Sequence, residues 1–181
     1  MTAPQPEFSR PVRIDTIGTA PRALTVEADE AERAALAGRF EFVSVEHLSA
    51  EIEIVRKGDA IRASGRLTAK VVQSCVASGE PVEEEVCEPF EILFCPEPSS
   101  AAADDEVELA EEDCDVVFYS GSSVDVGEAV AESLSLALNP WPRSPRAEAA
   151  LKEAGVKSED EAKAEASPFA GLAGLKDKLG K

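Results

Sequence analysis

Hydrophobic and polar residues alternate over residues 61–94, the longest such stretch of the chain. In its first half the apolar or small residues occupy the odd positions, which is the period of a strand with one buried face. After the turn sequence at residues 78–81, one phase holds the apolar residues Val82, Val86, Phe90, Ile92 and Phe94. The pattern predicts a long β-hairpin. Glu84, Glu88 and Pro89 interrupt the second strand, and they predict a bulge or an exposed edge.

A further strand precedes the hairpin. The period of two begins near residue 40 and predicts a strand near residues 47–56, followed by a turn at Lys57-Gly58-Asp59. Strands near residues 47–56, 60–76 and 82–95 would then follow one another through short connections. Because neighbours joined so closely pair antiparallel, we expect a meander.

Two shorter strands are predicted outside the meander. Residues 8–17 alternate and could add an edge strand, the only place where Pro11 is tolerated. Arg10 and Arg13 would face outward from it. Val116–Tyr119 supplies a short last strand.

Two N-cap patterns predict helices. Asp29, with Glu32 three residues later, begins an alanine-rich helix that Gly38 ends. Asp125, with Glu128 as its reciprocal partner, begins a helix whose apolar residues recur at intervals of three and four. This second helix is apolar enough to cover one side of the sheet.

The remaining segments complete the predicted organisation. A short helix runs from Pro145 through Ala154, with Gly155 closing it. Residues 97–113 are dense in carboxylates and predict a flexible loop, and residues 157–181 predict a linker with an amphipathic end. We therefore expect an α+β protein in which an antiparallel meander of about four to six strands packs against two or three short helices. Residues 1–156 would form its single domain.

The net charge of −18 arises in one segment. Residues 71–142 hold 18 acidic residues and no Lys or Arg, whereas the chain on either side is nearly balanced. Nucleic-acid affinity comes mainly from Lys and Arg that neutralise phosphates, so this segment is a poor match for a phosphate backbone. A basic protein partner fits better, and simple solubility is the alternative. No apolar run approaches about 18 residues, and no secretory signal is visible, so we expect a cytoplasmic protein without membrane contact.

Two candidate binding surfaces follow from the charges of the hairpin. Its second strand supplies the acidic candidates for a protein partner, Glu83, Glu84, Glu85, Glu88 and Glu91. The alternative is direct binding of RNA by the basic residues of the first strand and the turn before it, Arg56, Lys57, Arg62, Arg66 and Lys70.

Candidate chemistry is sparse. His47 and Cys75 could form a nucleophilic pair in space, but no catalytic signature accompanies them. The four cysteines lack the C-x-x-C pairing of a structural zinc site, and neither a calcium loop nor a glycine-rich phosphate loop occurs. We expect reduced thiols, no metal, no cofactor and no enzymatic activity, with a cysteine-dependent enzyme as the remaining alternative.

Three stretches together resemble the YceD family of large ribosomal RNA subunit accumulation proteins. They are the hairpin LTAKVVQSCVASGEPVEEEVCEPFEILF, the helix VDVGEAVAESLSLALNPWPRSP and the terminal SPFAGLAGLK, with a weaker match at EFSRPVRIDTIG. The family-motif positions are Cys75, Asp125, Gly127, Glu128 and Phe169. Many members have C-x-R-C in the hairpin turn, where this chain has Ala77 and Ser78 after Cys75. No role of a cysteine pair is therefore transferred.

The resemblance implies a function in the synthesis, processing or stability of large-subunit ribosomal RNA, without established catalysis. It also implies a basic large-subunit ribosomal protein, or a pre-ribosomal particle, as the partner. Ribosomal RNA itself is the alternative partner.

Overall fold

The computed structural model describes residues 6–97, 115–157 and 162. Contacts along the chain divide it into two units, Met1–Ser74 with Pro81–Pro140, and Cys75–Glu80 with Trp141–Lys181. The acidic loop from residue 98 onward, and the tail beyond residue 157 with its Phe169, lie outside the described residues, apart from residue 162. Each unit is described separately.

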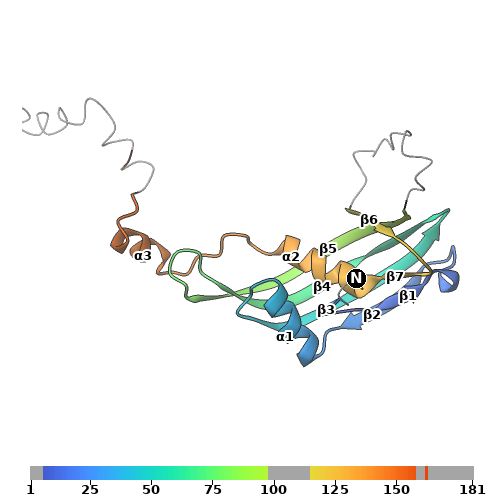
Figure 1. Ribbon diagram of the computed structural model, residues 1–181, viewed down its shortest axis with the longest axis horizontal. Coiled ribbons are helices and arrows are strands. Elements are labelled where there is room, and N and C mark those ends of the chain that lie inside the picture. Colours follow the sequence, from blue (N-terminus) through green and yellow to red (C-terminus); the bar gives the residue numbers. More distant parts are fainter. Residues whose placement is uncertain (1–5, 98–114, 158–161, 163–181) are drawn as a thin grey trace, which may run out of the picture. The chain divides into compact units, whose positions relative to one another are not determined.

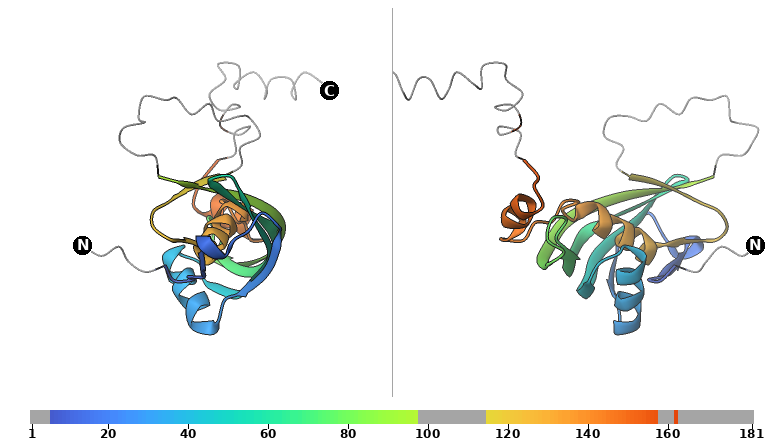
Figure 2. Two further views of the ribbon diagram at one scale, coloured as in Figure 1. Left: turned by 90° about the vertical axis from the view of Figure 1, so that its right-hand side faces the viewer. Right: turned by 60° about the vertical axis from the view of Figure 1, so that its left-hand side comes forward.

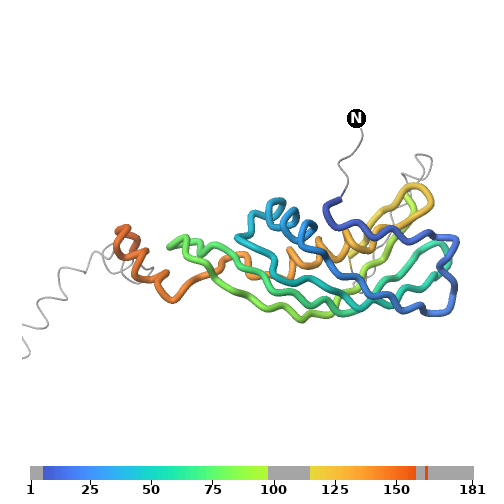
Figure 3. Tube along the Cα trace, turned by 90° about the horizontal axis from the view of Figure 1, so that it is seen from below, coloured from blue at the N-terminus to red at the C-terminus, as the bar shows by residue number. Residues whose placement is uncertain are grey.

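A five-stranded sheet forms the centre of the first unit (Figure 1). Its spatial order is β2 (Arg22–Glu27), β3 (Ser44–Lys57), β4 (Ala60–Ser74), β5 (Pro81–Pro96) and β6 (Asp115–Tyr119). Strands β2 to β5 pair antiparallel, so the predicted meander is confirmed, and Figure 3 shows β3, β4 and β5 running side by side. β6 instead pairs parallel with β5. A parallel pair needs a long crossover, and the connection from residue 97 to residue 115 is long enough to supply one.

The amino-terminal strands differ from the prediction. β1 (Pro11–Arg13) is short and pairs with β7 (Ser123–Asp125) in a separate two-stranded sheet, and a 3-10 turn follows it at Ile14–Thr16. The sheet edge is formed by β2, which the alternation did not predict because only Val26 of its side chains is buried.

The two predicted N-caps are present, but the helix ends shift. α1 (Glu30–Arg39) begins with a complete capping box from Asp29 and continues through Gly38. α3 (Ala147–Glu153), in the second unit, begins two residues after Pro145. Gly38 does not end α1 because its backbone stays helical, and the first left-handed residue is Glu41, with φ 59°.

α2 (Val126–Ala137) lies against one face of the sheet, which curls around it (Figure 2). Its buried residues pack with the inward side chains of β3, β4 and β5 in one core, which includes Leu48, Ile54, Ile61, Val71, Phe94, Val130 and Leu134. At Gly65 the main chain of β3 comes so close that a Cβ would lie 2.0 Å from the Glu51 carbonyl oxygen. The tight curl of the sheet therefore requires glycine in β4.

The interruptions in the second hairpin strand mark an edge and not a bulge. β5 pairs with β4 from Pro81 to Phe94 without a register shift. The bulge lies in β3, between Val45 and His47. Among the described residues, β5 has a partner on its outer side only from Ile92 onward, where β6 begins. Polar residues are tolerated in the apolar phase because Glu88 is exposed at this edge and Glu84, which is half-buried, has hydrogen-bond partners.

No helix among the described residues is both long enough and apolar enough to cross a membrane.

Candidate functional site

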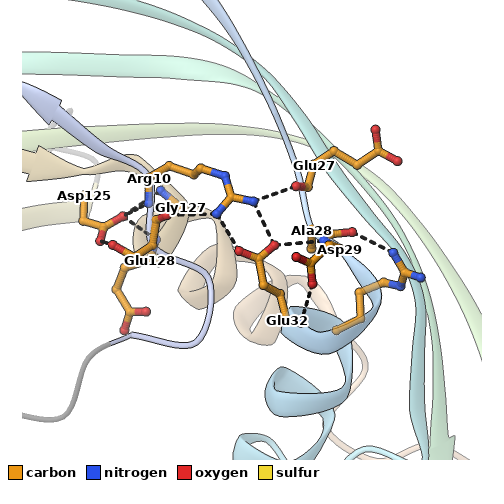
Figure 4. A network of polar contacts seen from close by, with 10 residues as sticks. Arg10, Glu27, Ala28, Asp29, Glu32, Asp125, Gly127 and Glu128 are labelled. Carbon is orange, nitrogen blue, oxygen red and sulfur yellow. Dashed lines mark hydrogen bonds and ion pairs between the residues drawn. The ribbon is translucent and has the colours of Figure 1, made fainter.

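Asp125, a family-motif residue, joins α2 to the amino-terminal segment (Figure 4). Its carboxylate accepts hydrogen bonds from the backbone N–H groups of Gly127 and Glu128, at 3.1 and 3.2 Å, and so caps the helix. It also accepts from the Ser9 hydroxyl at 2.5 Å and from the Arg10 backbone N–H at 2.7 Å. One side chain therefore satisfies groups from two distant parts of the sequence.

Gly127 allows this approach. A Cβ at this position would stand 2.3 Å from the Phe8 carbonyl oxygen and 2.9 Å from the Arg10 backbone nitrogen. Both are main-chain atoms, which cannot move aside as a flexible side chain can. The motif glycine is thus explained by the passage of the amino-terminal segment over the first turn of α2.

Arg10 points toward α1 and does not face outward, which corrects the prediction. Its guanidinium donates to both carboxylate oxygens of Glu32, at 2.6 and 2.8 Å, and to the Glu27 carbonyl oxygen at 2.9 Å (Figure 4). The hydrogen bond from Arg10 is the largest cause that lowers the pKa of Glu32 below its ordinary value of 4.5. Arg10 turns inward because Glu32, at the start of α1, offers a bidentate partner.

Glu128 does not return a capping bond to Asp125, contrary to the prediction. Its carboxylate accepts two hydrogen bonds from the Arg39 guanidinium, at 2.7 and 2.9 Å, and Arg39 also donates to Glu7 at 3.0 Å. Together, Arg10–Glu32, Arg39–Glu128 and the Asp125 bonds form a network, the clasp, that joins the amino-terminal segment, α1 and α2. The clasp has a structural role, because every one of these bonds connects elements of the fold.

The five acidic candidates of β5 are divided between the two faces of the sheet. Glu83, Glu85 and Glu91 follow the outward phase, whereas Glu84 and Glu88 follow the phase of the core residues. Glu84 is committed to the structure, because it accepts from the Asn139 backbone N–H at 3.0 Å and from the Gln73 side chain at 2.9 Å. Glu84 thus anchors the chain immediately after α2.

Two of the outward carboxylates pair with the basic residues of β4. Arg62 donates to Glu91 at 2.5 Å, which lowers the pKa of that carboxyl. Lys70 lies 3.3 Å from Glu83 and 2.9 Å from Glu46. Glu85 and Glu88 are exposed, and the described residues include no ion pair to either of them.

The basic candidates of β4 lie beside carboxylates. Arg62, Arg66 and Lys70 share the outer face of this strand and form the β4 row, and Glu51 of β3 is directly opposite Arg66. Arg56 and Lys57 end β3, where the Arg56 Nε donates to the Gly58 carbonyl oxygen at 3.2 Å. A phosphate at this row would therefore compete with carboxylates already in place.

Cys75 belongs to the second unit, where its side chain is 3% exposed. Its sulfur accepts hydrogen bonds from the backbone N–H groups of Ser144, at 3.2 Å, and Ser78, at 3.4 Å. These bonds, the one from Ser144 foremost, lower the pKa of the thiol to about 6. The hydroxyls of Ser78 and Ser144 lie 2.9 Å apart, and Ser144 donates to Glu80 at 2.8 Å. Ser78, which stands at the position of the second cysteine of C-x-R-C, therefore belongs to a hydrogen-bonded network with Ser144 and Glu80.

The Cys75 sulfur is held by backbone N–H groups, and His47 has a different partner. The His47 ring nitrogen bonds the Ser49 hydroxyl at 2.9 Å, on β3 of the first unit. Within the part of the chain that the structure describes, no three His, Cys, Asp or Glu side chains gather as metal ligands.

A family model described as "Large ribosomal RNA subunit accumulation protein YceD" matches residues 63–176. The chain belongs to the YceD family. Comparisons with curated proteins and with solved structures found no match.

The YceD match includes only part of the clasp. It contains Asp125, Gly127 and Glu128, whereas their partners Arg10 and Arg39 precede its first residue. The first turn of α2 is therefore held by Arg10 and Arg39, which lie outside the matched region.

Several long-range pairs were not identified from the sequence. Arg10 and Glu32 are 22 positions apart, Arg39 and Glu128 are 89 positions apart, and Ser144 lies 69 positions after Cys75. No local pattern indicates such pairs. The detectable signal was the motif Asp-x-Gly-Glu itself, in which the glycine inside a helix marks a close backbone approach.

Proposed function

We propose that this YceD protein supports the accumulation of large-subunit ribosomal RNA by binding a basic ribosomal protein, or the assembly particle that contains it. Binding occurs through the acidic strand β5, in the cytoplasm, and no reaction is catalysed. The observation that supports this proposal is the charge distribution. Residues 71–142 contain 18 acidic residues without a single Lys or Arg, and β5 has exposed carboxylates along an open edge. Such a surface attracts a basic partner and repels nucleic acid.

The geometry selects the residues for a test. Glu84 and Glu91 hold structural contacts, so their replacement would confuse binding with folding. Glu83, Glu85 and Glu88 are exposed, and Lys70, which pairs with Glu83 at 3.3 Å, keeps its closer partner Glu46 when Glu83 is replaced. The triple variant E83Q/E85Q/E88Q removes three charges from β5, and E30Q/E148Q/E153Q removes three exposed charges elsewhere.

The test is crosslinking in cells, followed by identification of bound protein and bound RNA. The wild-type chain and the control variant are expected to crosslink to a basic large-subunit ribosomal protein, and the β5 variant to lose most of that signal. Two results would overturn the proposal. They are equal crosslinking by both variants, and sedimentation of the protein wholly at the top of a gradient without recovered ribosomal protein.

Direct RNA binding through the β4 row is the second candidate, because Arg62, Arg66 and Lys70 share one face. The carboxylates of Glu46, Glu83 and Glu91 oppose it, since they already pair with two of these cations. RNA crosslinks that fall in R66Q, together with a salt slope reduced by about one, would favour RNA binding over the protein partner.

A further inference from the structure

Among the described residues, no strand pairs with the outer side of β5 from Pro81 to Glu91, and the backbone groups of this open part alternate in direction. At the other end of the strand, the Glu97 N–H donates to the Tyr119 carbonyl oxygen at 3.1 Å, so odd-numbered residues point their backbone toward β6. Because the direction alternates along a strand without register shifts, the odd residues of the open part also point away from β4. The outward N–H groups therefore belong to Glu83, Glu85 and Cys87. The outward carbonyl oxygen of Cys87 already accepts a hydrogen bond from the Arg66 side chain, at 3.5 Å, which leaves its second lone pair for a partner.

The two prolines of this edge agree with the assignment. Pro81 and Pro89 are both odd, so the N–H groups that they lack would have faced solvent and not β4. The two prolines delimit a window, residues 82–88. Every outward-facing residue of this window has both a backbone N–H donor and a carbonyl acceptor. An edge of this kind accepts an added strand, and β6 already occupies the adjoining part of the same edge.

A groove adjoins the window. It has a volume of about 500 Å³ and lies between the β5 edge and α2. Its apolar lining includes Phe90 and Leu136, whose side chain is 76% exposed, and its charged lining residues are Glu88, Glu91 and Asp115. No Lys or Arg is among the residues that line it. The groove thus offers an apolar contact within a negative field.

We propose that residues 82–88 bind an extended basic segment of the protein partner as an added β-strand, with an apolar side chain of that segment in the groove against Leu136. This inference rests on the proposed function and specifies its mode of contact. Backbone hydrogen bonds to Glu83, Glu85 and Cys87 supply affinity, and Lys or Arg side chains beside Glu83, Glu85 and Glu88 supply selectivity. The same carboxylates repel the β5 edge of a second copy, which keeps the edge from pairing with itself.

The test separates the backbone from the charge at one position. E85P removes both the charge and the outward N–H of residue 85 while leaving the ladder to β4 intact, as Pro81 and Pro89 do. E85Q is the matched control, because it removes the same charge and keeps the N–H. The probe is a synthetic peptide of alternating lysine and valine, long enough to span residues 82–88, titrated against the full chain. We expect E85P to bind it about tenfold more weakly than E85Q, because a backbone hydrogen bond is lost.

A second measurement tests strand addition even if E85P does not fold. The same peptide, N-methylated at alternate residues so that its N–H groups on one edge are removed, is titrated against the wild-type protein. Weakened binding, with amide exchange at Glu83, Glu85 and Cys87 slowed only by the unmethylated peptide, supports strand addition. Equal binding of both peptides, or of folded E85P and E85Q, overturns it.

The outcome is distinguishable from failure of the proposed function. If E85P keeps its crosslinks to the ribosomal protein at the level of E85Q, strand addition is wrong and acidic binding stands. If E83Q/E85Q/E88Q keeps those crosslinks, the proposed function fails, and this inference fails with it.

Discussion

The Cα of Gly127 lies so close to the main chain of Phe8 that a Cβ would stand 2.3 Å from the Phe8 carbonyl oxygen. The amino-terminal segment can cross the first turn of α2 only because this residue has no side chain. The clasp formed by Arg10, Asp125 and their partners depends on that approach.

Replacement of Gly127 by alanine is therefore expected to destabilise the protein by about 1 to 3 kcal/mol, since the added methyl must displace main-chain atoms. Urea denaturation measures the change. Gly38→Ala is the matched control, because α1 leaves open space there, and we expect it to stabilise by about 0.5 to 1 kcal/mol. Equal effects of the two changes would contradict the close approach.

The Arg10–Glu32 pair is expected to make stability depend on pH. Its hydrogen bond lowers the pKa of Glu32 in the folded state, so the pair stabilises above the ordinary value of 4.5 and loses its effect as pH falls through the lowered pKa. Glu32→Gln should cost about 1 kcal/mol at neutral pH, and the difference from wild type should shrink in acid. Urea titrations of both proteins from neutral to acidic pH check this, and a difference that is constant with pH would refute it.

Neighbouring carboxylates of β5 are expected to differ in their effect on folding. Glu84→Ala removes the acceptor of the Asn139 N–H and should destabilise by about 1 kcal/mol. Glu85→Ala changes an exposed side chain and should stay within about 0.5 kcal/mol of wild type. Thermal or urea unfolding of the two variants decides the matter, and the prediction is wrong if Glu85→Ala proves the more damaging change.

The Cys75 thiol is expected to ionise with a midpoint near pH 6, because the backbone N–H of Ser144 and the contacts of Ser78 favour the thiolate. The unfolded chain still binds this proton up to its ordinary pKa of 9.0, so stability from this group rises with pH between 6 and 9 and is lost as pH falls through 6. Thiolate ultraviolet absorbance of the wild type, with Cys75→Ser subtracted, measures the midpoint. A midpoint near 9 would show that the two N–H groups do not stabilise the anion.

The sequence predicted those features that depend on local order. The capping residues Asp29 and Asp125 lie within three positions of the helix N–H groups that they cap, and the period of two in β4 continues from Ile61 to Val71. β2 was not predicted because its alternation covers only Leu24 to Glu27, which is too short to distinguish from the residues around it. The polar residues of β5 predicted a bulge or an exposed edge, and the structure shows the exposed edge there, whereas the bulge lies in β3.

Taken by itself, the sequence of this YceD protein determined the meander, the capped helices and the segregation of charge, since each follows from neighbours along the chain. Only the tertiary structure decided which charges are available. It paired Arg10 with Glu32 and Arg39 with Glu128, committed Glu84 to Asn139, and left Glu85 and Glu88 exposed at the edge. The physical reason is that an ion pair forms between groups that folding brings within a few ångströms, and their separation along the chain contains no record of that approach.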